Sequence, residues 1–121
     1  IRQIKARARQ ARRLAERHGE LEPAERHRMR ICFKKLRYAV EFFTPLLPAK
    51  RLKPYLQTLS RLQDELGLIN DHVTAQALLD EALQNRPPGA IHGWMYGRHE
   101  LLVSELPEAL DTWLAQKAPW N

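Results

Sequence analysis

Basic side chains recur at helical spacing between residues 27 and 37. His27, Arg30, Lys34 and Arg37 stand three, four and three residues apart. At about 100° per residue they share one side of an α-helix, and at about 1.5 Å per residue they form a row about 15 Å long. Guanidinium and ammonium groups hold phosphate oxygens by charge-assisted hydrogen bonds. This row, called the ladder below, suits an extended polyanion better than one small anion.

The ladder has few partners in its own segment. Like charges at these spacings repel one another, and Glu41, four residues after Arg37, is the local carboxylate. Arg28 and Lys35 lie on the flank of the same helix and extend the basic surface. The excess charge is therefore available to an external anion. A solvated basic face is the alternative, and spacing alone does not decide between them.

The other side of this helix is apolar. Its apolar positions fall within an arc of about 120°, which we expect to face the core. They are Met29, Cys32, Phe33, Leu36, Ala39, Val40 and Phe43. Cys32 is the single cysteine, so an internal disulfide is excluded and we expect a buried structural thiol.

Length and composition indicate one globular domain spanning residues 1–121. The chain has 121 residues, of which 44% are hydrophobic and 28% charged. We expect no membrane span, because no window approaches 18 uninterrupted apolar residues. The first residues also lack the apolar run of a secretory signal, so we expect a cytoplasmic protein. Because the chain begins with Ile1, we expect it to be a piece of a longer protein.

The charge is asymmetric along the chain. Residues 1–53 hold 16 Lys and Arg against 5 Asp and Glu, whereas residues 54–121 hold 4 against 9. The balances are +11 and −5, which give the net +6. Such asymmetry favours a basic surface directed at a polyanion. Pairing of the basic half with the acidic half is the alternative.

Proline and glycine divide the chain into helical segments, and no β-type alternation is long enough for a strand. We expect four helices and an all-α up-down bundle. They cover about residues 2–18, 24–44, 52 or 54 to 85, and 91–116. Gly67 marks a weak point in the third helix, and Pro107 predicts a kink or break in the fourth.

The third helix carries amides within its apolar stripe. The stripe comprises Leu52, Leu56, Leu59, Leu62, Leu66, Ile69, Val73 and Ala77. Gln63 and Asn70 fall inside it and must find hydrogen-bond partners, either on neighbouring helices or among the basic side chains of the second helix. Asp71 is a candidate to orient an arginine, or else ordinary surface charge. Cations that would widen the basic surface are Arg51, Lys53 and Arg61.

Two motifs together resemble the CHAD family, the conserved-histidine α-helical domain. The first motif is His27 and Arg30 followed by Lys34, Lys35, Leu36, Arg37 and Tyr38. The second is Leu62, Gln63, Leu66, Gly67, Ile69, Asn70 and Asp71, with Ile69 where leucine is usual. The resemblance is most specific over residues 24–85, and "GWMYGR" resembles the family's next helix weakly. Family members usually carry two pseudo-symmetric bundles, so the resemblance implies one half, which we expect to be the C-terminal one.

The resemblance implies non-catalytic binding of inorganic polyphosphate and localisation to polyphosphate granules. We expect the motif cations His27, Arg30, Lys34, Lys35 and Arg37 to bind the polymer, with Tyr38, Gln63, Asn70 and Asp71 in support. Arg28, Arg51, Lys53 and Arg61 lie outside the motifs, and we expect them to bind it as part of the wider basic surface. A partner half-domain or a homodimer is implied as well. Family domains often lie beside a triphosphate-hydrolysing domain, so an accessory role in such an enzyme is an alternative.

Nucleic-acid or general polyanion binding is the other alternative. Base recognition calls for exposed aromatic rings, and we expect Tyr38 and Phe42 to pack against a neighbouring helix instead. We expect no cofactor and no metal, because no two histidines stand at i, i+4 on one helix. His92 and His99, seven residues apart, approach one face but do not suffice for a site.

Overall fold

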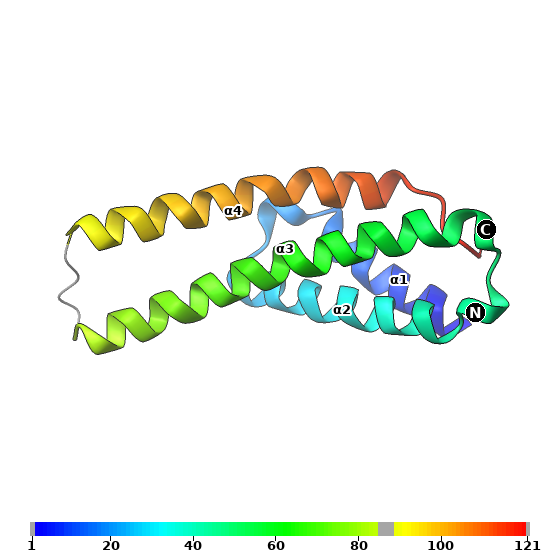
Figure 1. Cartoon of the computed structure of the whole chain (residues 1–121), viewed down its shortest axis with the longest axis horizontal. Coiled ribbons are helices and arrows are strands. Elements are labelled where there is room, and N and C mark those ends of the chain that lie inside the picture. Colours follow the sequence, from blue (N-terminus) through cyan, green and yellow to red (C-terminus); the bar gives the residue numbers. More distant parts are fainter. Residues whose placement is uncertain (1, 85–88, 121) are drawn as a thin grey trace.

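The computed structural model describes residues 2–84 and 89–120, without the side chains of Ala90 and His92. Those residues form four α-helices and no strand (Figure 1). The helices are α1 (Arg2–Ala15), α2 (Pro23–Phe42), α3 (Ala49–Ala82) and α4 (Gly89–Ala115), with 3-10 turns at His18–Glu20 and Thr44–Leu46. Each helix packs against the next along the chain, and α1 also contacts α4. The predicted all-α bundle of four helices is confirmed.

A capping box fixes the start of α2. The backbone N–H of Glu22 donates to the Glu25 carboxylate at 3.3 Å, and Pro23 occupies the first helical position. Met29, Phe33, Leu36 and Val40 are fully buried, while the other predicted core residues are partly buried against them. The apolar face of α2 is therefore confirmed, although Cys32 is only partly buried.

The core lies where all four helices run together. The Phe33 ring of α2 meets the Trp113 ring of α4 edge to face, with centroids 4.9 Å apart. In α1, Ala11 and Ala15 are fully buried beside Ile4. Because alanine adds only a methyl group, these positions let α1 lie close to its neighbours. The helix that carries the ladder, α2, therefore packs directly against this core.

The long helices α3 and α4 continue beyond this core. With 34 residues α3 is about 51 Å long, whereas the 20 residues of α2 span about 30 Å. Figure 1 shows α3 and α4 extending as a pair past the ends of α1 and α2. We call residues 72–82 with 89–101 the outer pair, and the rest the bundle. No helix of the described residues is long and apolar enough to cross a membrane.

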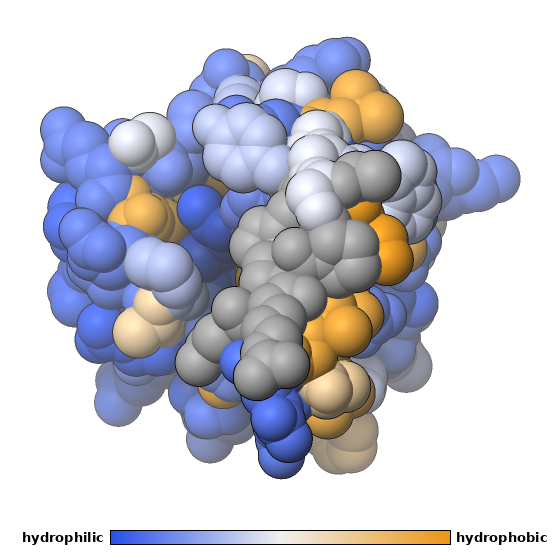
Figure 2. All heavy atoms as spheres, turned by 90° about the vertical axis from the view of Figure 1, so that its left-hand side faces the viewer, coloured by the Kyte–Doolittle hydropathy of each residue, from blue (hydrophilic) through white to orange (hydrophobic). Residues whose placement is uncertain are grey.

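Apolar surface is exposed on the outer pair. Val73 is 44% exposed and Ala77 is exposed as well, so the predicted burial of the end of the third-helix stripe is wrong. The reason is that α1 and α2 have ended there, which leaves no third helix to cover these residues. Figure 2, viewed from this end, shows apolar patches open to solvent beside polar surface.

Helix ends and prolines depart from the predictions. The first helix ends at Ala15 rather than near His18, because the chain tightens into a 3-10 turn in which the Glu20 N–H donates to the Arg17 carbonyl at 2.8 Å. The third helix begins earlier than expected, at Ala49, and runs through Pro54. It ends at Ala82, and the predicted end at Asn85 lies outside the described residues.

The predicted break at Pro107 is wrong, because α4 runs through it as one helix. Proline removes one backbone hydrogen bond and costs a helix interior about 3 kcal/mol. Around it Leu106, Ala109 and Leu110 are buried in the core. Their burial outweighs the local cost, which is why tertiary packing overrides the proline signal. Gly67 likewise lies inside an unbroken α3.

Candidate functional site

The ladder lies on the side of α2 that turns from the core towards α3 and solvent. His27 and Lys34 are exposed, whereas Arg30 and Arg37 are partly buried. The flanking residues Arg28 and Lys35 are exposed as well. Five of these six side chains, all but Arg37, form no ion pair with a described residue. The face therefore carries a row of cations that the described part of the chain leaves largely uncompensated.

Arg37 is the member of the ladder that the protein holds in place. Its Nε donates to the Glu41 carboxylate at 2.9 Å, one turn along α2. A terminal nitrogen donates to Oε1 of Gln63 on α3 at 3.1 Å. Gln63 thus orients a basic side chain of the second helix, which was one of its two predicted uses. The outer part of the guanidinium remains accessible, because the side chain is 30% exposed.

Arg30 stands over a pocket between the start of α2 and the middle of α3. The pocket measures about 360 Å³; Arg26, His27 and Asn70 line it together with Arg30, and Leu66 is part of its apolar wall. The N-terminus of α2 lies at the same place, but Pro23 has no N–H and the capping box occupies the Glu25 N–H. An oxyanion in this pocket would therefore meet mainly the basic side chains of α2.

The Nε of Arg30 is buried and has no hydrogen-bond acceptor in the described part of the chain. A buried donor left unpaired costs about 1–3 kcal/mol. Native proteins usually satisfy such donors with protein, water or ligand. An oxygen of a water molecule or of a bound anion would satisfy Nε of Arg30.

Lys53 lies on α3 beside an open groove of about 430 Å³, which Leu52 and Leu56 also line. Seventeen residues separate it from Asn70, which corresponds to about 26 Å along the axis of α3. The ladder itself is about 15 Å long. A ligand bound to the ladder would reach Lys53 only if it continued along α3.

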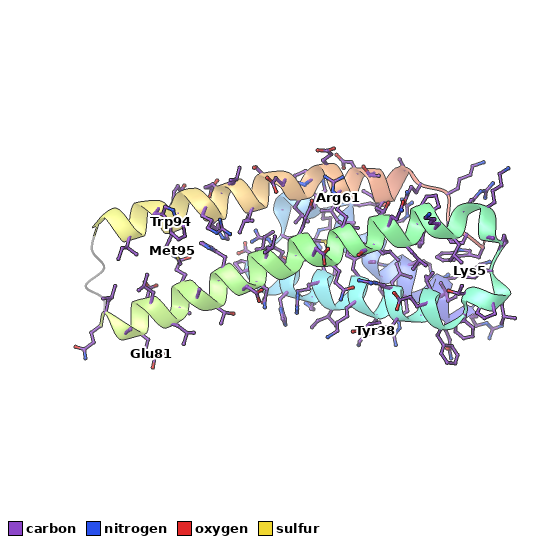
Figure 3. The ribbon with its side chains drawn as sticks, in the orientation of Figure 1. Lys5, Tyr38, Arg61, Glu81, Trp94 and Met95 are labelled. Carbon is purple, nitrogen blue, oxygen red and sulfur yellow. The ribbon has the colours of Figure 1, made fainter. Side chains whose placement is uncertain are left out.

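Two predicted cations of α3 point elsewhere. Arg61 is two residues before Gln63, about 200° away around the helix, and its guanidinium pairs with Glu65 at 3.0 Å and Glu108 at 3.7 Å. Figure 3 shows Arg61 between α3 and α4, whereas Tyr38 projects from the outer side of α2. Arg51 lines a different pocket, at the end of the bundle. The structure therefore does not bring Arg61 or Arg51 beside the ladder.

The supporting aromatic residues are more open than expected. Tyr38 is 55% exposed and Phe42 is 78% exposed, so the prediction that they pack against a neighbouring helix is wrong. Facing them across a pocket, α1 presents the small or polar side chains of Ala6 and Gln10. Lys34 places its ammonium 5.9 Å from the centre of the Tyr38 ring, within range of a cation–π contact.

Asp71 is exposed and forms no ion pair with a described residue, so the structure does not place it against an arginine. Sequence reasoning missed Arg26, which lines the pocket beside Arg30. Its position four residues before Arg30 was the available signal, since such residues neighbour each other on a helix. No group of three or more potential metal ligands occurs within residues 2–84 and 89–120, where the side chain of His92 is not described.

The similarity of the chain to known proteins is found with a family model. No curated protein and no solved structure matches the chain. The family model of the CHAD domain matches residues 2–80, which include both motifs, the ladder and the lining of the pocket beside Arg30. The match does not distinguish the halves of a family domain, so the C-terminal assignment stays a prediction. Because the matched region covers more than half of the chain, this protein belongs to the CHAD domain family.

Proposed function

We propose that the chain is a non-catalytic module that binds inorganic polyphosphate along the ladder, and that binding directs it to polyphosphate granules in the cytoplasm. One end of the bound segment would lie in the pocket beside Arg30. From there the polymer would pass Lys34 and reach the accessible side of Arg37. The repeated negative charge of polyphosphate complements a row of cations better than a compact anion does.

The observation that carries the proposal is the uncompensated charge. Arg30 has a buried Nε without an acceptor, and Lys34 forms no ion pair with the described residues. Phosphate oxygens would supply the missing acceptor and neutralise both cations. Binding would release counterions from the polymer, so affinity should fall steeply as salt rises.

Hydrolysis is less well supported than binding. Phosphoryl transfer generally uses carboxylates that hold metal ions or position a nucleophile. The carboxylate beside the ladder, Glu41, is engaged by Arg37. An accessory role beside a triphosphate- or polyphosphate-processing domain remains compatible with binding. Release of orthophosphate from polyphosphate in the presence of Mg²⁺ would contradict the non-catalytic proposal.

The direct test is a titration of the chain with long-chain polyphosphate at several salt concentrations. Lys34→Ala should weaken binding about two- to tenfold and lower the salt dependence by about one counterion. Arg61→Ala is the matched control, since Arg61 is exposed but lies on the α4 side of α3. Circular dichroism should show equal helix content in both variants. Equal loss of affinity in both would contradict binding along the ladder.

Glu41→Gln tests the same face in the opposite direction. It removes the carboxylate that occupies Nε of Arg37 and leaves a side chain of similar size. Polyphosphate should then bind more tightly. Unchanged or weaker binding would mean that Arg37 does not contribute to the site.

Single-stranded nucleic acid is the second candidate, favoured by the exposed rings of Tyr38 and Phe42. Aromatic side chains beside cations can stack on bases. At matched salt, tighter binding of single-stranded DNA than of polyphosphate, with loss of that binding in Phe42→Ala, would favour the second candidate over the first.

A further inference from the structure

A second cationic pocket lies at the end of the bundle, where the C-terminal segment returns to α1. It measures about 300 Å³ and is lined by Lys5, Arg9 and Arg12 of α1 and by the aromatic residues Tyr55, Trp113 and Trp120. Figure 3 shows Lys5 at this end, opposite the outer pair. None of the ladder residues lines it. Cations on one wall and aromatic rings on another make a combination that the ladder does not provide.

One buried polar atom of the lining residues lacks a partner. Trp113 is 4% exposed, and its indole N–H lies beside the Tyr55 phenol, on which it acts as a hydrogen-bond partner. Oε1 of Gln116, which also lines the pocket, is buried without a donor. The pocket thus offers an unpaired acceptor, Oε1 of Gln116, to a donor group of a ligand. Buried groups of this kind are usually satisfied in native proteins, by protein, water or ligand.

The charge around Tyr55 and Gln116 is positive on both sides. These two residues also line an adjoining pocket, together with Lys50, Arg51 and Lys117. On the α1 side, Arg12 pairs with Glu16 at 3.2 Å and donates to the Leu114 carbonyl at 3.1 Å. Lys5 and Arg9 are exposed and form no ion pair with the described residues. An anion entering here would meet several cations and one carboxylate already engaged by Arg12.

The aromatic wall of the pocket is neutral. Burial raises the pKa of Tyr55 to about 12, while the nearby Trp113 indole and Arg12 act in the opposite direction. The phenol therefore stays protonated at neutral pH. The Tyr55 and Trp120 rings meet edge to face with centroids 5.6 Å apart, and Trp120 is only partly buried. Part of the Trp120 side chain therefore remains open to a ligand.

We propose that this pocket binds a nucleoside monophosphate or a closely similar aromatic phosphate ester. The volume, room for about ten water molecules, exceeds what one orthophosphate fills and matches the lower end of small-molecule sites. The phosphate would lie against Lys5 and Arg9. The ring would lie against Trp120, with a donor group of its edge directed at Oε1 of Gln116. An inorganic anion would use the cations but leave the aromatic wall without a role.

The test measures quenching of tryptophan fluorescence in a Trp94→Phe background. Trp94 is exposed on the outer pair, so its removal leaves Trp113 and Trp120 as reporters. Adenosine 5′-monophosphate, adenosine and orthophosphate are titrated separately at matched ionic strength. The monophosphate should quench saturably and bind at least tenfold more tightly than either fragment, because only it carries both the ring and the phosphate.

Variants of α1 connect the signal with the pocket. Lys5→Gln and Arg9→Gln should each weaken binding of the monophosphate about two- to tenfold. Arg7→Gln is the matched control, since Arg7 lines the separate pocket next to Tyr38. Lys34→Ala should leave binding of the monophosphate unchanged but weaken binding of polyphosphate. The two proposed sites can therefore be tested independently.

Three results would overturn the proposal. The first is the absence of saturable quenching by the monophosphate. The second is binding of orthophosphate as tight as that of the monophosphate. The third is equal binding by Arg9→Gln and Arg7→Gln. The second result would reduce the pocket to a simple anion site. The third would place the ligand elsewhere.

Discussion

The bundle and the outer pair contain similar apolar side chains but use them differently. In the bundle, neighbouring helices bury Leu36 and Leu62 completely, although Phe42 at its surface is 78% exposed. In the outer pair, Leu78 is 62% exposed and Trp94 is 63% exposed. Met95, which lies between the two helices in Figure 3, is the one buried hydrophobic residue among the described part of the pair. Burial thus depends on which face of a helix meets its neighbours, and not on hydrophobicity alone.

The basic residues of the candidate site also lie in one of the two regions, the bundle. The ladder and its flanking cations lie on α2 in the bundle, supported by Gln63 of α3. The family match ends at residue 80, so it includes α1, α2 and nearly all of α3 but leaves α4 outside. The candidate site therefore rests on the matched and best-packed helices. We expect changes in the bundle to affect both stability and polyphosphate binding, and changes in the outer pair to affect neither strongly.

The largest expected difference is between two leucine-to-alanine substitutions. Leu36→Ala removes a fully buried side chain and should lower the free energy of unfolding by about 2–5 kcal/mol. Leu78→Ala makes the same chemical change on the outer pair, where the side chain is mostly exposed, and should cost less than about 1 kcal/mol. Urea denaturation followed by circular dichroism measures both. Equal losses would mean that the outer pair has a core of its own.

Much of the fold was predictable because helical periodicity reports which face of a helix is apolar. It placed Met29, Phe33 and Leu36 in the core correctly. It failed for Val73 and Ala77, because a pattern along one helix does not tell where the neighbouring helices end. Proline chemistry predicted a kink or break at Pro107, and the break is wrong, because the burial of flanking residues outweighs a local helix-breaking signal.

The candidate site was predictable in its cations but not in their environments. The ladder follows from spacing alone, and the angular offset between Arg61 and Gln63 could have separated the two sides of α3. No pattern in the sequence indicated that Nε of Arg30 would be buried without an acceptor. The exposure of Tyr38 was not predictable either, because it depends on how much of α2 is covered by the side chains of α1.

A smaller and opposite effect is expected from two glycine substitutions. A Cβ at Gly67 in α3 or at Gly97 in α4 would meet nothing within 4 Å. Because alanine favours helix over glycine by about 0.5–1 kcal/mol, Gly67→Ala and Gly97→Ala should each stabilise the chain by about that amount. Thermal or urea denaturation measures the gain. Destabilisation of either variant would show that its glycine serves packing after all.

The affinity of the same two variants for polyphosphate also compares the two regions. Gly67 lies one helical turn from both Gln63 and Asn70, on the side of α3 that adjoins the ladder. If polyphosphate runs close to α3 there, the added methyl group should weaken its binding about two- to fivefold. Gly97→Ala on the outer pair should leave binding unchanged. Equal affinity of both variants would confine the polymer to the α2 side of the face.

The smallest expected effect concerns the junction between the two regions. His72 of α3 and His99 of α4 stack there with ring centroids 5.4 Å apart. Burial lowers the pKa of His99 from its usual 6.5; Arg26 of α2 and His72 lower it further, while Glu100 opposes them. As the pH falls, the unfolded chain therefore binds a proton at this position before the folded chain does. Stability should fall as pH drops through about 6.5 and level off below the folded-state pKa.

Replacing the titrating ring isolates this contribution from other groups that change charge in the same range. His99→Gln keeps a polar side chain but cannot take up the proton, so the loss of stability between pH 7.5 and pH 5.5 should be smaller in the variant than in the parent. Urea midpoints at the two pH values give the comparison. Identical pH dependence in both proteins would show that protonation of His99 does not change the stability of the folded chain.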